Sequence, residues 1–469
     1  MAVSSSFRPS VSPSTGFYNA RKALLKSTAR DAMDYLDEED ARAVAPSPEA
    51  ISALAALGGP LPERPTDPET VLRQLHCLGS PATVAKTGGR NFGFVNGGSL
   101  PAALAASWLV SAWDQNASFF VQSPVAVTLE EIALEWVRQL LNLPEGTGGA
   151  VVTGATMASF TSLAAARHAL LERAGWNVEA DGLFGAPPIH VVVSEEVHTS
   201  VLKSLGMLGL GRNRVTRVPV DNQGRMRADA LPALDANTIL CLQAGNVNTG
   251  AFDPAAEILP VAREAGAWVH VDGAFGLWAT ASPVYSPLTQ GFELADSWAT
   301  DAHKWPNIGY DCGLALIRHP QELRATMSME AAYLLQGEHR EPSYYNPELS
   351  RRARGVELWA GLRSLGRQGM AEIVERTCAH ARHFAMGLSD AGYEILNDVV
   401  INQVLVSFGS AERTRQVIEE IQKDGNCWCG STVWQGHTAM RISVSNWATS
   451  RADVERSLQA MLEAAQKIS

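Results

Sequence analysis

The stretch Asp296-Ser-Trp-Ala-Thr-Asp-Ala-His-Lys-Trp305 decides how the rest of the chain is interpreted. It begins as an apolar run of the kind that forms a buried strand, and it ends in His303 and Lys304. An ammonium group leaves water only when another group compensates its charge, so Lys304 at the end of a buried strand needs a chemical partner. A second apolar run, Trp268-Val-His-Val-Asp272, ends in an acid thirty-two residues earlier. We expect the two strand ends to lie side by side on one sheet.

Strand and helix patterns alternate from residue 150 to residue 317. Short apolar runs predict strands, and apolar residues spaced three and four positions apart predict helices. Such alternation is typical of an α/β fold, here a mainly parallel, seven-stranded type of sheet covered by helices. Strands are predicted at residues 150–152, 189–193, 215–218, 238–242, 268–271, 297–300 and 314–317, and helices at 157–173, 198–208 and 255–265.

Changes in pattern divide the chain into three predicted regions. Residues 1–90 form an N-terminal helical segment, in which Asp67 followed by Pro68 predicts a helix start. Residues 91–325 form the large α/β domain. Residues 326–469 begin with a long mobile loop or lid and continue as a smaller C-terminal α+β domain, in which Gly366 separates two long helices.

Composition restricts the class of protein. The 469 residues carry a formal charge of −11, which is unfavourable for a nucleic-acid partner. The longest apolar stretch, residues 100–113, is too short to cross a bilayer, so no membrane partner is expected. The six cysteines have no spacing typical of a zinc site or a disulfide framework, which favours reduced thiols in a cytoplasmic protein. Residues 1–17, rich in Ser and Pro, are expected to be a mobile arm or an organelle transit peptide.

Three groups of polar residues follow the ends of predicted strands. Val152-Thr-Gly-Ala-Thr156 leads into a helix, where backbone N–H groups could bind a phosphate, although any strand-to-helix turn can have this composition. His198 could stack on a flat cofactor, or it could simply begin a helix. Residues 243–250 carry amides that suit a ring substituent, or they form an ordinary polar loop.

Asp272 and Lys304 carry the chemistry that the other groups would support. A carboxylate at the end of a buried strand is costly unless a cation or donor faces it, and a protonated pyridine nitrogen would supply one. The alternatives for Asp272 are a metal ligand or a strand cap; no second acid or histidine stands at ligand spacing, so no metal is predicted. Lys304 could be a surface lysine beside Trp305, or the amine that forms a Schiff base with an aldehyde.

The order of these groups along the chain favours one cofactor. A phosphate loop, a histidine, an acid and a lysine follow successive strands and would meet at the carboxyl edge, where open α/β sheets bind ligands. We therefore predict pyridoxal 5′-phosphate, bound through Lys304 with Asp272 at its ring nitrogen. Phe92 and Phe94 lie among glycines in residues 88–98 and could line the pocket, or they could be two buried rings of a turn.

These residues resemble the group II pyridoxal-phosphate-dependent amino-acid decarboxylases of the aspartate-aminotransferase fold, fold type I. The resemblance extends from about residue 92 to the carboxyl end. It implies a homodimer with the active site at the subunit interface, in which the N-terminal segment contributes to the dimer and to the substrate wall. The matching motifs are Thr153-Gly-Ala-Thr-Met-Ala-Ser159, Ser194-Glu-Glu-Val-His198, His270-Val-Asp-Gly-Ala274, and Asp296-Ser297 with His303-Lys-Trp305.

Carried over by position, the resemblance also implies roles for single residues. Tyr333 falls where these enzymes keep a mobile-loop tyrosine that protonates the substrate carbon, and Phe94 matches an aromatic position of the substrate wall. The implied cofactor contacts are Ala155, Thr156 and His303 at the phosphate, His198 over the ring, Asn246 near the ring substituents, Asp272 at the ring nitrogen, Ala274 beneath the ring and Lys304 at the aldehyde carbon.

The reaction that the resemblance implies is decarboxylation of an L-amino acid to an amine and CO2. Phe92 and Phe94 suggest an aromatic or bulky apolar substrate. Two positions depart from the family pattern: Met157, where an acid is common, and Asp301, where Asn is frequent. Other outcomes therefore stay open, namely carbon–carbon or carbon–sulfur cleavage, conversion of an amine to an aldehyde, and a catalytically silent regulatory protein.

Overall fold

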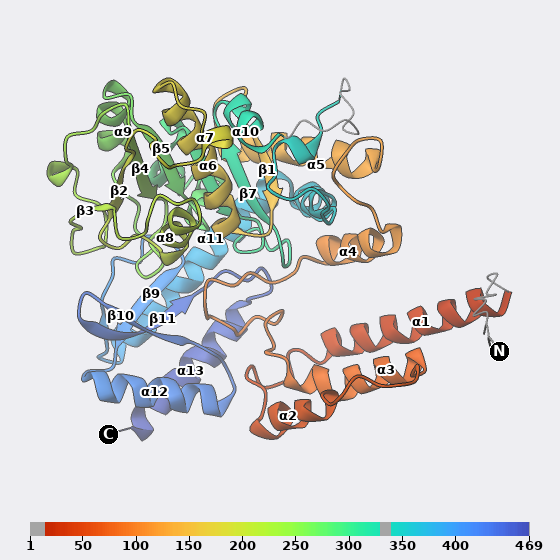
Figure 1. Ribbon diagram of the computed structural model, residues 1–469. Helices are drawn as coiled ribbons and strands as arrows, with labels where there is room; N and C mark the ends of the chain where they lie inside the picture. The colour runs from red at the N-terminus through yellow and green to blue at the C-terminus, as the bar shows by residue number, and fades with distance from the viewer. Residues whose placement is uncertain (1–14, 329–338, 469) are drawn as a thin grey trace, which may run out of the picture. The chain divides into compact units, whose positions relative to one another are not determined.

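The computed structural model describes residues 15–328 and 339–468, which form two compact units, Met1–Gly88 and Gly89–Ser469. The predicted domain boundaries at residues 90 and 325 stay predictions. The first unit is helical, as its sequence indicates (Figure 1). Asp67 caps the third helix, because its side chain accepts the Thr70 N–H at 3.0 Å. The helices are α1 (Thr15–Asp37), α2 (Pro48–Ala53) and α3 (Pro68–Gln74).

A seven-stranded sheet lies at the centre of the second unit (Figure 1). Its strand order is β1-β7-β6-β5-β4-β2-β3, and only β7 runs antiparallel to its neighbours. The predicted α/β fold with a mainly parallel sheet is therefore confirmed. The strands are β1 (Gly148–Val152), β2 (His190–Ser194), β3 (Thr216–Val218), β4 (Thr238–Gln243), β5 (Trp268–Asp272), β6 (Ser297–Asp301) and β7 (Gly313–Ile317).

Helices cover both faces of this sheet. Val152, Val193 and Ile239 point to one face, where they join the core of α6, α8 and α10. Val151 and Val192, their neighbours in sequence, point to the other face and join the core of α5, α9 and α11, because side chains alternate along a strand. The helices are α4 (Pro101–Trp113), α5 (Pro124–Leu140), α6 (Ala155–Arg173), α7 (Val178–Asp181), α8 (Thr199–Met207), α9 (Ala255–Glu264), α10 (Pro320–Met327) and α11 (Arg354–Asp390).

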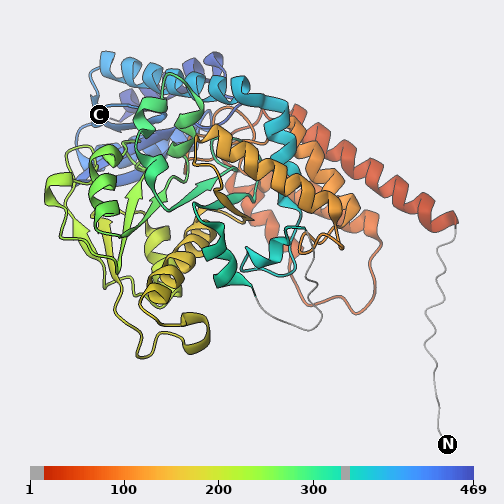
Figure 2. The ribbon, with the colours of Figure 1, turned by 90° about the horizontal axis from the view of Figure 1, so that it is seen from above.

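The helix α11 changes direction at Gly366, whose φ of 58° is not helical (Figure 2). The sequence predicts two helices separated at this glycine, and the structure has one long element with a kink there. Among residues 15–328 and 339–468, no helix combines the length and the apolar character that a membrane span requires.

A smaller sheet of order β10-β11-β9-β8 lies in the carboxyl-terminal part. Apolar runs predict strands at residues 404–408 and 439–444, and helical spacing predicts helices at 413–422 and 451–468; these correspond to β9, β11, α12 and α13. The sequence does not predict β8, which is two residues long, or β10, whose sequence Gly-Ser-Thr-Val-Trp is only weakly apolar. The elements are β8 (Glu394–Ile395), β9 (Gln403–Ser407), α12 (Ala411–Asp424), β10 (Gly430–Trp434), β11 (His437–Ser443) and α13 (Arg451–Lys467).

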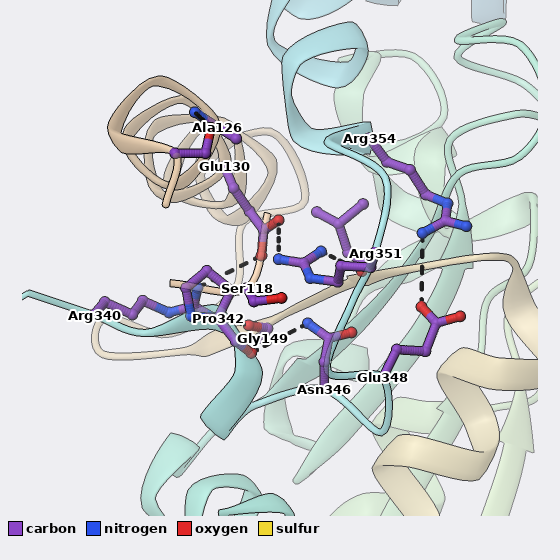
Figure 3. A network of polar contacts seen from close by, with 12 residues as sticks. Ser118, Ala126, Glu130, Gly149, Arg340, Pro342, Asn346, Glu348, Arg351 and Arg354 are labelled. Atoms are coloured by element: carbon purple, nitrogen blue, oxygen red, sulfur yellow. Dashed lines mark hydrogen bonds and ion pairs between the residues drawn. The ribbon is translucent and has the colours of Figure 1, made fainter. Parts of the chain in front are cut away.

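A buried network of charges joins α5, β1 and residues 340–354 (Figure 3). Glu130 Oε2 accepts from Arg351 Nη2 at 2.6 Å, and both side chains are fully buried. Arg351 Nη1 also donates to the Val151 carbonyl at 3.2 Å. Arg340 lies 3.6 Å from the other carboxylate oxygen of Glu130 and donates to the Gly149 carbonyl. The network thus holds the strand β1 immediately before the Thr153-Gly154 turn.

Candidate active site

Two neighbouring parallel strands end in acids at the same edge of the large sheet. Asp272 ends β5 and Asp301 ends β6. Lys304 lies in the turn after β6, and its Nζ is 3.1 Å from Asp301 Oδ2. The sequence predicts that the amine and Asp272 lie close together; in the structure Asp301 is the acid in direct contact with the amine.

Asp272 is only 5% exposed, and its Oδ1 accepts the Ala274 N–H at 3.2 Å. Burial raises the pKa of the Asp272 carboxyl above its usual value, while the nearby His198 and Lys304 lower it. A carboxylate in this environment gains most from a cation or a charged donor, because water does not solvate it. Asp272 is therefore chemically suited to face a protonated ring nitrogen.

Of the two roles that its sequence allows, His198 has that of a residue that begins a helix, and its place over a cofactor ring stays a prediction. It is the N-cap of α8, and its Nδ1 accepts the Ser200 N–H at 3.3 Å and lies 2.7 Å from Ser200 Oγ. This arrangement leaves the proton of a neutral ring on Nε2. Burial lowers the pKa of His198, and Asp272 raises it, whereas Lys304 and Arg441 lower it further. The N-cap hydrogen bond thus fixes the orientation of the His198 imidazole, whose pKa depends on both Asp272 and Lys304.

The turn between β1 and α6 lies against the end of β6. The Ala155 N–H at the start of α6 donates to Asp301 Oδ1 at 2.6 Å. A Cβ at Gly154 would lie 3.2 Å from the His303 ring, and one at Gly313 would lie 2.4 Å from the Gly154 Cα. His303 Nδ1 accepts the Cys312 N–H at 3.2 Å, and its Nε2 is 3.6 Å from Asp301. Ala155 and His303, predicted at the phosphate, are thus brought together.

The remaining predicted cofactor residues differ in their surroundings. Thr156 follows Ala155 in the first turn of α6. Ala274 is partly buried next to Asp272, and its carbonyl accepts the Asp301 N–H at 3.0 Å. Asn246 is buried and uses its amide inside the protein, because Nδ2 donates to Glu196 at 2.9 Å and Oδ1 accepts the Asn248 N–H at 2.8 Å. Asn246 therefore has the contacts of an ordinary polar loop.

The two phenylalanines predicted to line the pocket have opposite environments. Phe92 has no exposed surface, and its ring lies 5.0 Å from that of Phe384 in the core of the smaller sheet. Its predicted contact with substrate is therefore wrong in this structure. Phe94 is 66% exposed and stacks on Trp428 at 5.3 Å. Tyr333 lies outside the described residues.

Two further side chains at this edge were not predicted. Tyr310 stacks on His303 with ring centres 4.2 Å apart, and its hydroxyl donates to Asn96 at 2.7 Å. Arg441 of β11 is partly buried; burial lowers the pKa of its guanidinium, and its charge reaches His198. The only sequence signal for Arg441 is a cation inside an apolar strand. Tyr310 could have been found in the sequence as an aromatic residue that stands six positions after Lys304 in a loop with glycine.

Comparison with known families decides what kind of site this is. A model described as the pyridoxal-dependent decarboxylase conserved domain matches residues 62–409. The chain belongs to this family. The decarboxylase is therefore a pyridoxal-phosphate-dependent carboxy-lyase that acts on an amino acid, so the predicted family, enzyme class and cofactor are confirmed.

Individual relatives agree with this assignment. A tryptophan decarboxylase from Oryza sativa subsp. japonica is 28% identical to this decarboxylase over 396 residues, 76% of each chain. An aromatic-L-amino-acid decarboxylase from Drosophila lebanonensis is 29% identical over 376 residues, 74% of this chain and 91% of that protein. The crystal structure of Oryza sativa TDC with PLP and tryptamine has a TM-score of 0.89, covering 99% of this chain and 100% of that chain at 22% identity, and it shows the common fold.

The residues of this decarboxylase fit pyridoxal phosphate. The buried Asp272 carboxylate, with its raised pKa, suits a cationic ring nitrogen. Lys304 offers a primary amine at the same sheet edge, and Ala274, two residues after Asp272, is half-buried and carries only a methyl group. The start of α6 presents backbone N–H groups that can bind an anion, of which the Ala155 N–H is bonded to Asp301.

Proposed function

We propose that this decarboxylase converts an aromatic or other bulky apolar L-amino acid to its amine and CO2. The observation that carries the substrate class is two ring stacks, Phe94 on Trp428 and Tyr310 on His303, which we take as the aromatic wall of the substrate site. The loop that holds Phe94 packs closely on the lysine, since a Cβ at Gly97 would lie 2.0 Å from the Lys304 carbonyl oxygen. The tryptophan and aromatic amino-acid decarboxylases among the relatives support the same class.

We assign the cofactor contacts to the residues gathered at this edge. Bound pyridoxal phosphate would supply an electron-withdrawing ring that stabilises negative charge at the substrate α-carbon. Asp272 would hold a proton at the ring nitrogen, and His198 would lie over the ring. Lys304 would hold the cofactor through its aldehyde carbon. We assign the phosphate to Ala155, Thr156 and His303, the space beneath the ring to Ala274, and an indirect role, shaping the loop near the ring, to Asn246.

Two residues are proposed to act on the substrate itself. Arg441 is a partly buried cation whose charge reaches His198, so it can orient a carboxylate of the substrate. Fixed orientation matters because only a substrate held with its carboxylate bond correctly aligned reacts at a useful rate. Tyr333 is the proposed donor of the proton to the α-carbon.

We also propose a cytoplasmic homodimer. The helix α4 exposes Trp108, Leu109 and Trp113, which are 44%, 52% and 42% exposed, and large apolar side chains gathered on one element are typical of an interface. The six cysteines are free, which suits a reducing compartment. Light scattering after size-exclusion chromatography should give twice the chain mass; a monomer would contradict the homodimer.

A substrate panel tests the reaction and the substrate class together. The protein, purified with pyridoxal phosphate, is given single L-amino acids, and CO2, amine and aldehyde are measured in each reaction. We expect equal amounts of CO2 and amine from aromatic substrates. Activity restricted to glutamate would contradict the substrate class, and aldehyde in place of amine would contradict the reaction. In Tyr333→Phe we expect loss of amine formation; unchanged CO2 and amine would exclude the proposed proton donor.

A matched pair of phenylalanines tests the aromatic wall. Phe94→Ala should raise KM for aromatic amino acids and change that for a small amino acid much less, because the lost contact is a ring face. The control is Phe184→Ala, which removes a phenylalanine that is 97% exposed in the loop after α7. Equal effects of the two substitutions would remove Phe94 from the substrate wall.

A further inference from the structure

A single carboxylate contacts two of the three residues that the proposed function assigns to the cofactor phosphate. Asp301 Oδ1 accepts the Ala155 N–H at 2.6 Å, and Asp301 Oδ2 lies 3.6 Å from His303 Nε2. The same Oδ2 is 3.1 Å from Lys304 Nζ. The Asp301 side chain is only 3% exposed, so bulk water does not screen its charge. Asp301 thus fills the role of an anion at the start of α6.

This position is unfavourable for a second anion. Backbone N–H groups and the helix dipole at the start of α6 are what binds a phosphate, and the Ala155 N–H is already used. Two acidic groups in one buried site cannot both keep full charge, so one of them holds a proton. Lys304 offsets the charge of Asp301 here, but the proposed function assigns its amine to the cofactor aldehyde.

We propose that Asp301 competes with the cofactor phosphate for the start of α6, so that phosphate binding takes up a proton and is weaker than with an uncharged side chain. The inference rests on the proposed assignment of the phosphate to Ala155, Thr156 and His303. It makes Asp301 a residue that sets cofactor affinity, separate from the chemical step. The other titratable groups that face Asp301 are Lys304, His303, His198, Asp272, Tyr310 and Cys312.

Two probes without an aldehyde isolate the phosphate from Lys304. The first probe, 4-deoxypyridoxine 5′-phosphate, keeps the ring and the phosphate but cannot bond to the lysine; the second, 4-deoxypyridoxine, lacks the phosphate. The Kd of each is measured on the apoprotein by fluorescence titration, at about pH 7 and about pH 8.5, where the phosphate is past its second pKa of about 6. Asp301→Asn is the matched variant, because its Oδ1 still accepts the Ala155 N–H.

For the wild type we expect the phosphorylated probe to bind more weakly at the higher pH, by up to tenfold per pH unit if one proton is taken up. Asp301→Asn should tighten that probe by about tenfold at about pH 8.5, equivalent to about 1.4 kcal/mol, and flatten the pH dependence. The probe without phosphate should change by less than about twofold. Thermal melting checks that the variant is folded.

Three outcomes would overturn the inference. The first is that Asp301→Asn binds the phosphorylated probe no tighter than the wild type. The second is that it tightens both probes equally, which would mean that Asp301 acts on the ring or on Lys304. The third needs no variant: a wild-type Kd ratio of the two probes that does not change with pH.

A Thr156→Val variant separates this inference from the assignment on which it rests. If the phosphate is held at the start of α6, this variant weakens only the phosphorylated probe. In that case, a failure of Asp301→Asn to tighten binding overturns the role of Asp301 alone. If Thr156→Val leaves both probes unchanged, the assignment of the phosphate is wrong.

Discussion

Two buried clusters of charge in this decarboxylase differ in how fully their charges are paired. Around Glu130, both carboxylate oxygens face arginines, and Arg351 also bonds to a strand carbonyl (Figure 3). At the edge of the large sheet where β5 and β6 end, Asp272 has one described hydrogen bond, from a backbone N–H, and burial raises the pKa of its carboxyl. The first cluster stabilises the fold. In the second, the proposed partner of Asp272 is a ligand, so substitutions there should affect chemistry more than stability.

Lys304→Ala should have the largest effect on activity. Without the amine the aldehyde has no covalent anchor, so turnover should fall below detection and the absorbance of the bound Schiff base should disappear. The free energy of unfolding of the apoprotein should fall by less than the loss of about 3–5 kcal/mol typical of a fully buried pair, because the Lys304 side chain is 20% exposed. Lys304→Arg is the matched control, since it keeps a cation near Asp301 and should be equally inactive. Substantial turnover in either variant would contradict the anchor.

Glu130→Ala should have the largest effect on stability. Removing one partner of a fully buried ion pair leaves the Arg351 charge uncompensated, which typically costs about 3–5 kcal/mol. Urea unfolding of the apoprotein measures this loss. Adding Arg351→Met to the variant should recover part of it, because the buried charge is then removed. A loss without any recovery would mean that the carboxylate acts through packing.

Asp272→Asn should change the free energy of unfolding less than Glu130→Ala does, and it should raise this free energy where Glu130→Ala lowers it. Because burial raises the pKa of Asp272, the folded protein binds its proton more strongly than the unfolded chain, whose carboxyl has a pKa of about 4. The stability that this proton contributes is present below about pH 4 and is lost as pH rises through the raised pKa. The melting temperature of the wild-type apoprotein should therefore fall relative to Asp272→Asn over this range.

The opposite trend, with the wild type gaining stability relative to the variant as pH rises, would show that Asp272 is fully paired in the apoprotein. The same variant should lose most of its turnover, because an amide does not hold a proton at the ring nitrogen. Loss of activity together with a neutral or positive effect on stability would distinguish Asp272 from Glu130.

The smallest effect is expected for an exposed ion pair. Arg415 and Glu412 of α12 are 3.0 Å apart, but their side chains are 50% and 65% exposed. Solvent screens such pairs, so Glu412→Ala should unfold at the same urea concentration as the wild type. A decrease in the unfolding urea concentration as large as that of Glu130→Ala would mean that burial does not determine how much an ion pair contributes to stability.

The local parts of this fold and site were predictable from sequence. An apolar run that ends in a charged residue marks a strand end, and this pattern located Asp272 at the end of β5 and Lys304 just after the neighbouring strand β6. The start of α3 was predictable because Asp67 caps it within three residues. The pyridoxal-phosphate cofactor followed from the order of such strand ends, each of which is a local feature.

What could not be predicted depends on contacts between distant residues. Asp301 and the Ala155 N–H are 146 positions apart, and no local pattern shows that they meet. Phe92 and Phe94 share one loop, but Phe384 buries the first ring and a φ of 58° turns the second outward. The roles of all the predicted cofactor residues, Asp272 and Lys304 included, stay predictions, as do the homodimer and the role of Tyr333.

The close approach of Gly154 and Gly313 limits how this decarboxylase can vary. A methyl group at Gly313 would lie 2.4 Å from the Gly154 Cα, which is backbone and cannot rotate away. In a saturation library scored for folded protein, position 313 should therefore return glycine almost alone, although it contacts no proposed substrate group. Substitutions that change cofactor affinity are therefore expected in the side chains around the turn, such as Asp301, and not at Gly313 in β7, which packs against the turn.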